Sequence, residues 1–143
     1  MSAYAKRRAT TLAAHAQAEV RGAHLRSAQG HLRAALDAPA LTYAGRHAVQ
    51  RALWAVEEGL GGQPDSMFGA VGALQVPKAD LLKPGAAPAD AAAVARALRE
   101  AAADLRRVPW RTRADAQRWA RRPAALADLA RRIEGASADT RGA

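Results

Sequence analysis

The stretch LTYAGRHAVQRALWAVEEGL, residues 41–60, has the clearest secondary-structure pattern in the chain. Its small and apolar residues recur at steps of three and four, which is the spacing of one face of an α-helix. That face consists of Gly45, Val49, Ala52, Leu53, Val56 and Leu60. Gly59, Gly61 and Gly62 then interrupt the pattern. We therefore expect a helix over about residues 41–60 that ends at these glycines.

The segment before it, about residues 3–37, predicts one long helix that ends before Pro39. This helix has two apolar faces, which are rotated from each other by more than 100° at about 3.6 residues per turn. The first is formed by Ala5, Ala9, Leu12, Ala16, Val20 and Ala23, and the second by Leu25, Leu32 and Leu36. Gly22 lies at the change. Either the helix bends there, or its two faces meet two different partners.

Two further helical patterns follow in the C-terminal half. One covers about residues 90–107, with Asp90 as its expected N-cap. Thr112 and Asp115 resemble a weak capping box for the next. Its apolar stripe continues across Pro123, so one kinked helix and two abutting helices are both allowed. The stripe consists of Ala116, Trp119, Leu126, Leu129, Ala130 and Ile133.

Residues 63–89 are rich in proline and glycine and predict a crossover between two helical pairs. A short helix capped by Ser66, and one further turn within residues 77–83, are possible inside it. No strand pattern and no internal repeat is found in the sequence. The expected fold is an all-α, compact bundle of four to six helices. Residues 1–134 form a single domain, and residues 135–143 form a frayed tail.

The composition limits the class of protein. Leu, Ile, Val and Phe supply only 23 of the 143 residues, a thin core for a chain of this size. We therefore expect stability to depend on a homo-oligomer or a partner protein. The sequence has no cysteine and no apolar stretch that fits a signal peptide or a membrane span. We expect a cytoplasmic protein that needs no cofactor and does not contact a membrane.

The segment RRVPWRTRADAQRWARR, residues 106–122, holds seven arginines and one aspartate, and the whole chain carries a net charge of +9. Arginine forks bind phosphate well, so this segment predicts contact with DNA or RNA. Trp110, in a turn after Pro109, is expected to be exposed and to stack on a base, whereas Trp119 is expected in the core. The candidate nucleic-acid-binding residues are Arg106, Arg107, Trp110, Arg111, Arg113, Arg118, Arg121 and Arg122.

Other interpretations of these residues stay open. The arginines could form a merely solvated helix face, partly neutralised by the spacings Arg111–Asp115 and Asp128–Arg132. A helix–turn–helix can be drawn over residues 112–134, although its turn lacks the usual glycine. Trp54 lies off the apolar face of its helix, and we interpret it as a candidate protein-interface residue.

Catalytic and metal signatures are weak. His24 and His31 share a helical face, but no carboxylate joins them at the spacing of a zinc site. The pairs Arg26–His31 and Arg8–His15 have a spacing that occurs in helical ribonucleases. Chance gives two such pairs in so arginine-rich a chain, so they support no family assignment. No catalytic residue and no metal ligand is assigned.

The sequence therefore favours a non-enzymatic, basic nucleic-acid-binding subunit of a larger nucleoprotein assembly. A helical interaction or scaffold subunit that oligomerises is the alternative. A small helical ribonuclease that uses His31 as a base is the second alternative.

Overall fold

The computed structural model describes residues 2–61 and 80–142. These residues form five α-helices and no strand, which confirms the predicted all-α bundle and its range of helix numbers. The expected short helix capped by Ser66 lies outside the described residues. The helices are α1 (Ala3–Leu36), α2 (Tyr43–Gly59), α3 (Pro88–Arg107), α4 (Arg113–Trp119) and α5 (Arg122–Gly142).

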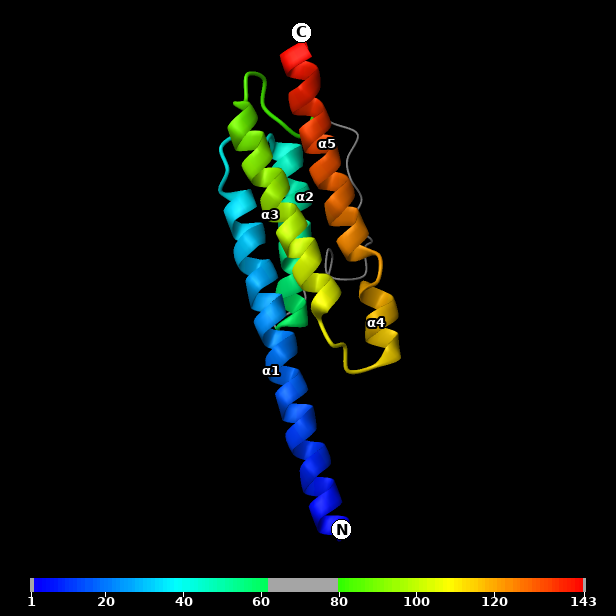
Figure 1. Ribbon diagram of the computed structural model, residues 1–143. Coiled ribbons are helices and arrows are strands. Elements are labelled where there is room, and N and C mark those ends of the chain that lie inside the picture. Colours follow the sequence, from blue (N-terminus) through cyan, green and yellow to red (C-terminus); the bar gives the residue numbers. More distant parts are fainter. Residues whose placement is uncertain (1, 62–79, 143) are drawn as a thin grey trace.

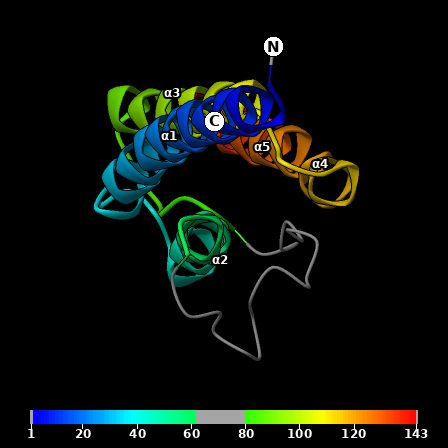
Figure 2. The ribbon, with the colours of Figure 1, turned by 90° about the horizontal axis from the view of Figure 1, so that it is seen from below.

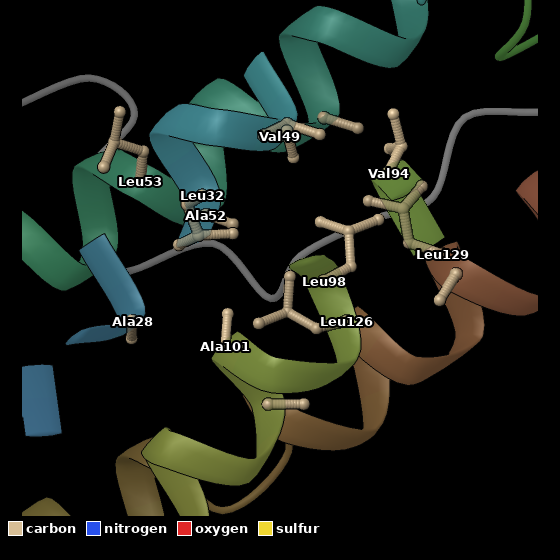
Figure 3. Close-up of a cluster of buried hydrophobic side chains, with 14 of the residues drawn as sticks. Ala28, Leu32, Val49, Ala52, Leu53, Val94, Leu98, Ala101, Leu126 and Leu129 are labelled. Carbon is tan, nitrogen blue, oxygen red and sulfur yellow. The ribbon is translucent and has the colours of Figure 1, made fainter. Parts of the chain in front are cut away.

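Helix α3 is the centre of the bundle and packs between α1 and α5, while α2 packs on α1 (Figure 1). Seen along the bundle, α1, α3 and α5 lie beside one another, and α2 covers one side of them (Figure 2). The side chains that meet between these helices are small, with leucines and valines set among alanines (Figure 3). The largest fully buried side chains are Leu32, Leu41, Leu98, Leu126, Leu129, Ile133, Val49, Val56 and Val94.

The helix boundaries follow from local capping chemistry. The side chains of Ser2 and Thr42 accept hydrogen bonds from backbone N–H groups in the first turns of α1 and α2. Thr112 caps α4 as predicted, because its hydroxyl oxygen accepts from the N–H of Asp115 at 3.1 Å. The predicted cap at Asp90 is wrong: α3 begins at Pro88, and Asp90 lies in its first turn. Proline is favoured at this first position because it has no N–H to satisfy.

Two expectations about the C-terminal part are settled. A turn at Ala120 and Arg121 separates α4 from α5, and Pro123 lies in the first turn of α5, so these are two helices and not one kinked helix. They follow one another along the same edge of the bundle (Figure 1), unlike the crossed helices of a helix–turn–helix. Helix α5 continues past residue 135 to Gly142, and Ser137 is buried.

The start of α2 is held by the segment that includes residues 80–83, while residues 77–79 of the further turn expected within residues 77–83 lie outside the described residues. The described end of that segment pairs with the residues before α2 through an isolated antiparallel bridge between Leu41 and Leu82. Thr42 N–H donates to the carbonyl of Leu81 at 3.0 Å, and the Thr42 hydroxyl donates to the carbonyl of Asp80 at 2.6 Å. The first of these bonds satisfies the N–H of the N-cap residue, which has no partner within α2 itself.

This pairing requires glycine at position 45. A Cβ atom there would lie 2.4 Å from the carbonyl oxygen of Leu81, and backbone cannot yield as a flexible side chain can. We predict that Gly45→Ala lowers the free energy of unfolding by about 1–3 kcal/mol, the usual cost of overpacking. Chemical denaturation measures it. Gly30→Ala is the control, since nothing lies within 4 Å of a Cβ at position 30, and an equal loss in both variants would contradict the explanation.

The N-terminal half of α1 projects from the bundle as a free helix (Figure 1). Every side chain from Lys6 to Val20 is exposed, and Leu25 is the first buried residue of α1. The change occurs close to Gly22, where the sequence changes from one apolar face to the other. The second face packs in the bundle through Leu25 and Leu32, and the residues of the first face from Ala9 to Ala23 are exposed.

Candidate nucleic-acid interface

Trp110 and Trp119 form a stacked pair where the turn after α3 folds back on α4. Their ring centroids are 4.6 Å apart, and the ring planes differ by 21°. Trp119 is buried, which confirms its predicted core position. Trp110 is half-buried and packs against the core, so the prediction of an unburied Trp110 is wrong. One face of Trp110 is therefore occupied by Trp119, and a ligand can reach only what remains of its surface.

Arg122 also belongs to this stack rather than to the exposed arginines. Its guanidinium carbon lies 4.0 Å from the centroid of the Trp119 ring, and the residue is buried. Such cation–π contact over tryptophan is favourable. Burial, reinforced by the nearby charge of Arg118, lowers the pKa of Arg122, although an arginine remains cationic at neutral pH. The expectation that Arg122 contacts phosphate from solvent does not fit this position.

Glycine at position 59 lets the end of α2 meet the tryptophan stack. A Cβ there would lie 3.0 Å from the Trp119 ring. The neighbouring Glu58 accepts a hydrogen bond from Arg118 at 2.8 Å between Oε1 and Nη2. This exposed pair joins α2 to α4 and neutralises part of the charge that the sequence assigned to binding. Within α5, Asp128 also forms an ion pair with Arg131.

The other predicted arginines remain available. Arg106, Arg111, Arg113 and Arg121 are exposed and form no ion pair within the described residues. Arg107 is also exposed, with its Nη1 atom 3.6 Å from Asp104 Oδ1. Gln117 and Arg132 are exposed together with Arg113 and Arg121, as expected for the face opposite a buried Trp119. Arginines from the end of α3, the turn and α4 thus gather at the end of the bundle from which α1 projects (Figure 1).

Three adjoining hollows lie between α1, the end of α2 and the turn that carries Trp110. Their volumes are about 270, 430 and 190 Å³. Trp110 and Asp115 line the second and third, and Arg21 and Arg111 line the first and second. The second hollow has three arginines, Arg21, Arg26 and Arg111, and one acidic residue, Asp115. We call the concave surface that the three hollows form together the basic groove.

Arg21 and Arg26 are the groove residues that sequence reasoning missed. Both come from α1, 85 and 80 residues before the start of the arginine-rich segment at Arg106. The Nη1 atom of Arg21 donates to the carbonyl oxygen of Pro109 at 3.3 Å, which fixes the turn against α1. Local spacing shows that Arg21 lies on a helix. It does not show which distant turn that helix meets, and no signal in this region of the sequence could have paired the two.

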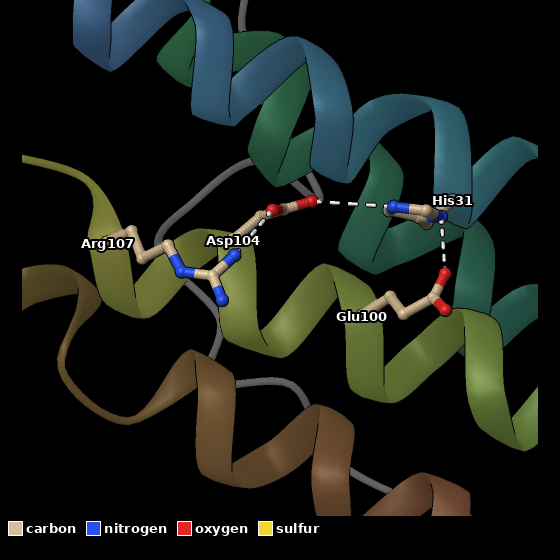
Figure 4. Close-up of polar contacts among 4 residues, drawn as sticks. All are labelled: His31, Glu100, Asp104 and Arg107. Carbon is tan, nitrogen blue, oxygen red and sulfur yellow. Dashed lines mark ion pairs between the residues drawn. The ribbon is translucent and has the colours of Figure 1, made fainter.

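His31 lies in a second polar cluster, on the interface of α1 with α3 (Figure 4). Its Nδ1 atom is 3.1 Å from Glu100 Oε2, and its Nε2 atom is 3.6 Å from Asp104 Oδ2. Asp104 is buried, and Arg107 approaches its other oxygen. The imidazole therefore bridges two helices between two carboxylates, while the Arg26 guanidinium lies back along α1 beside Gly22. Arg26 and His31, the pair considered for the ribonuclease alternative, thus contact different residues.

We predict that His31→Ala lowers the free energy of unfolding by about 1–3 kcal/mol. The buried Asp104 carboxylate then loses the nearby imidazole, which offsets part of the cost of burying it. Thermal or chemical denaturation measures this. His24→Ala, seven residues earlier on the same helix, is the matched control and should change stability less. A stability unchanged by His31→Ala, together with loss of RNA cleavage, would instead support the ribonuclease alternative.

The remaining observations concern Trp54, metal binding, membrane-spanning helices and similarity to known proteins. Trp54, the predicted interface residue, is half-buried on α2. Within residues 2–61 and 80–142, no three histidine or carboxylate side chains are grouped so that they could hold a metal ion. In the same part of the chain, no helix has both the length and the apolarity needed to cross a bilayer. No protein-family model, curated protein or solved structure matches the chain.

Proposed function

We propose that this protein is a non-enzymatic nucleic-acid-binding subunit of a larger nucleoprotein assembly, and that it binds through the basic groove and the exposed arginines around it. DNA and RNA both fit this proposal. The proposal includes a cytoplasmic location, where the protein can reach either DNA or RNA. The proposed contact residues are Arg21, Arg26, Arg106, Arg107, Arg111, Arg113 and Arg121, with Trp110 at the edge of the groove.

One observation supports this proposal above the others: arginines from two distant parts of the chain line one concave surface beside a tryptophan. In the 430 Å³ hollow, three arginines face one aspartate, so the lining has a net charge of +2. A flexible strand of phosphates can follow such a groove, with guanidinium groups on the backbone and an aromatic ring near a base. A merely solvated helix face would have no reason to be concave or to include a half-buried aromatic ring.

The test is a binding titration at several salt concentrations with duplex DNA, single-stranded DNA and RNA of equal length. We expect binding that weakens as salt rises, because each phosphate contact releases a condensed counterion. Preference for single strands would locate binding in the groove, since a base can then reach Trp110. Absence of binding to all three ligands at low salt would refute the proposed function.

A scaffold role is the second candidate, and the projecting half of α1 favours it. A single copy of the chain exposes the apolar residues Tyr4, Leu12 and Val20 on this helix, and exposed apolar surface frequently marks a protein contact. The two functions are compatible, because an assembly subunit can bind nucleic acid at one surface and protein at another. Sedimentation in the presence and absence of nuclease separates association through protein from association through bound nucleic acid.

A further inference from the structure

The outward face of the projecting half of α1 has the pattern of a helix-pairing surface. Around the helix axis, Leu12 lies about 140–160° from Leu25 and Leu32, which pack in the bundle. The side chain of Leu12 is 61 % exposed, and that of Val20 is 46 % exposed. On one side of Leu12 this face carries the small residues Ala5, Ala9, Ala16 and Ala23, and on the other side it carries Arg8 and Glu19. We call this surface the Leu12 face.

We propose that a second copy of this chain packs on the Leu12 face in the antiparallel direction. With the two-fold axis near residue 14, Leu12 of each copy lies opposite Ala16 of the other. Ala5 of each copy then lies opposite Ala23 of the other. A large side chain faces a small one in the central layers, which is how facing helices interdigitate. The inference does not depend on nucleic-acid binding.

Charge on the Leu12 face selects the antiparallel direction. Arg8 lies on one edge of this face near its free end, and Glu19, the only acidic residue of α1, lies near its bundle end, whereas Lys6 and Arg7 lie more than 100° away around the axis. Arg8 and Glu19 lie within about 20° of each other around the axis, on the same edge of the face. The same edges of two helices meet in an antiparallel pair, so Arg8 of one copy approaches Glu19 of the other. A parallel pair would instead place Arg8 at the level of Arg8 and Glu19 at the level of Glu19 of the other copy, so this contact between opposite charges would not form.

The arrangement of the molecule leaves room for this contact. The bundle lies on the side of α1 opposite the Leu12 face, and its turn after α3 meets α1 at Arg21, near one end of the overlap. Each bundle would therefore sit beyond the N-terminus of the other copy, at opposite ends of the paired helices (Figure 1). The overlap of residues 5–23 is about 27 Å long. One helix pair of this length falls near the lower limit of about 1,200 Å² for specific interfaces, so we expect a reversible dimer in the micromolar range.

The first test changes the centre of the Leu12 face. Leu12→Glu is expected to weaken the dissociation constant at least ten-fold in sedimentation equilibrium, because the new charge is placed against Ala16 of the other copy. Thr10→Glu introduces the same charge on the opposite side of α1 and should leave association unchanged. Both variants should melt like the parent bundle, since residues 10 and 12 are exposed. A monomeric parent chain at 100 µM, or a dimer that Leu12→Glu leaves intact, would overturn the proposal.

The second test determines the direction of pairing. Arg8→Glu and Glu19→Arg should each weaken the dimer several-fold, and the double variant should restore it, because only an antiparallel pair joins these positions. Introduced cysteines give an independent readout, since the chain has none of its own. Under oxidation, Ala5→Cys mixed with Ala23→Cys should give a disulfide-linked heterodimer, and Ala5→Cys alone should not. A disulfide formed by Ala5→Cys alone would show parallel pairing and refute the antiparallel dimer.

Discussion

Replacing Trp119 by alanine is expected to lower the free energy of unfolding by about 3–5 kcal/mol, the usual cost of truncating a buried tryptophan. Trp119 joins three parts of the fold, because it stacks on Trp110, lies under the Arg122 guanidinium and contacts Gly59 of α2. Its removal leaves a cavity and also leaves Arg122 buried without its aromatic partner. Chemical denaturation at constant pH measures the loss.

Trp110→Ala is the matched control for this result. Trp110 is half-buried, and an aromatic pair contributes about 0.5–1.5 kcal/mol beyond the area that it buries. We therefore expect a clearly smaller loss of stability from Trp110→Ala than from Trp119→Ala. Equal losses from both variants would show that the two rings act as one core element, and the remaining surface of Trp110 would then have no separate part in binding.

The affinity of the protein for duplex DNA is expected to fall about 150-fold between 50 and 200 mM salt. This estimate assumes four phosphate contacts. Each contact adds about −0.9 to the slope of log K against log salt. Four is the number of exposed arginines without an ion pair among the described residues of the segment 106–122: Arg106, Arg111, Arg113 and Arg121. Fluorescence anisotropy over a salt series measures the slope directly.

Removing three of these arginines together, Arg111→Ala, Arg113→Ala and Arg121→Ala, should reduce the slope from about −3.6 to about −0.9. The control removes the same charge from exposed positions in the other half of the bundle, with Arg33→Ala, Arg46→Ala and Arg96→Ala. If both triple variants lose the same slope, then the protein binds through its overall charge, and the basic groove is not the site.

The helices could be predicted because their signals are local. The steps of three and four in α2, the Thr112 cap of α4 and the apolar stripe through Leu126 and Ile133 each lie within a few residues of sequence. The same periodicity correctly placed Trp119 in the core. Side chains that depend only on which face of a helix they occupy were therefore predictable, as the exposure of Arg113 and Arg121 also shows.

The arrangement of the candidate site was not predictable, because it depends on contacts between distant segments. Whether Trp110 is free or stacked is decided by how the turn after α3 folds back on α4. Arg122 looks like any other arginine of its segment until α5 brings it over the Trp119 ring. The position of Arg21 against Pro109 and of His31 against Asp104 requires the packing of α1 on the rest of the bundle, which no spacing within α1 encodes.

The free half of α1 has a consequence for how the protein orders itself. Its turns are exposed within the described part of a single copy, so their helicity depends on the alanine-rich sequence and on propagation from the bundle. A helix supported in this way unravels from its free end, and its amide hydrogens should exchange far faster than those of α3. Any surface that covers this half would slow the exchange. The rate at Leu12 therefore measures, without a label, whether the helix has a neighbour.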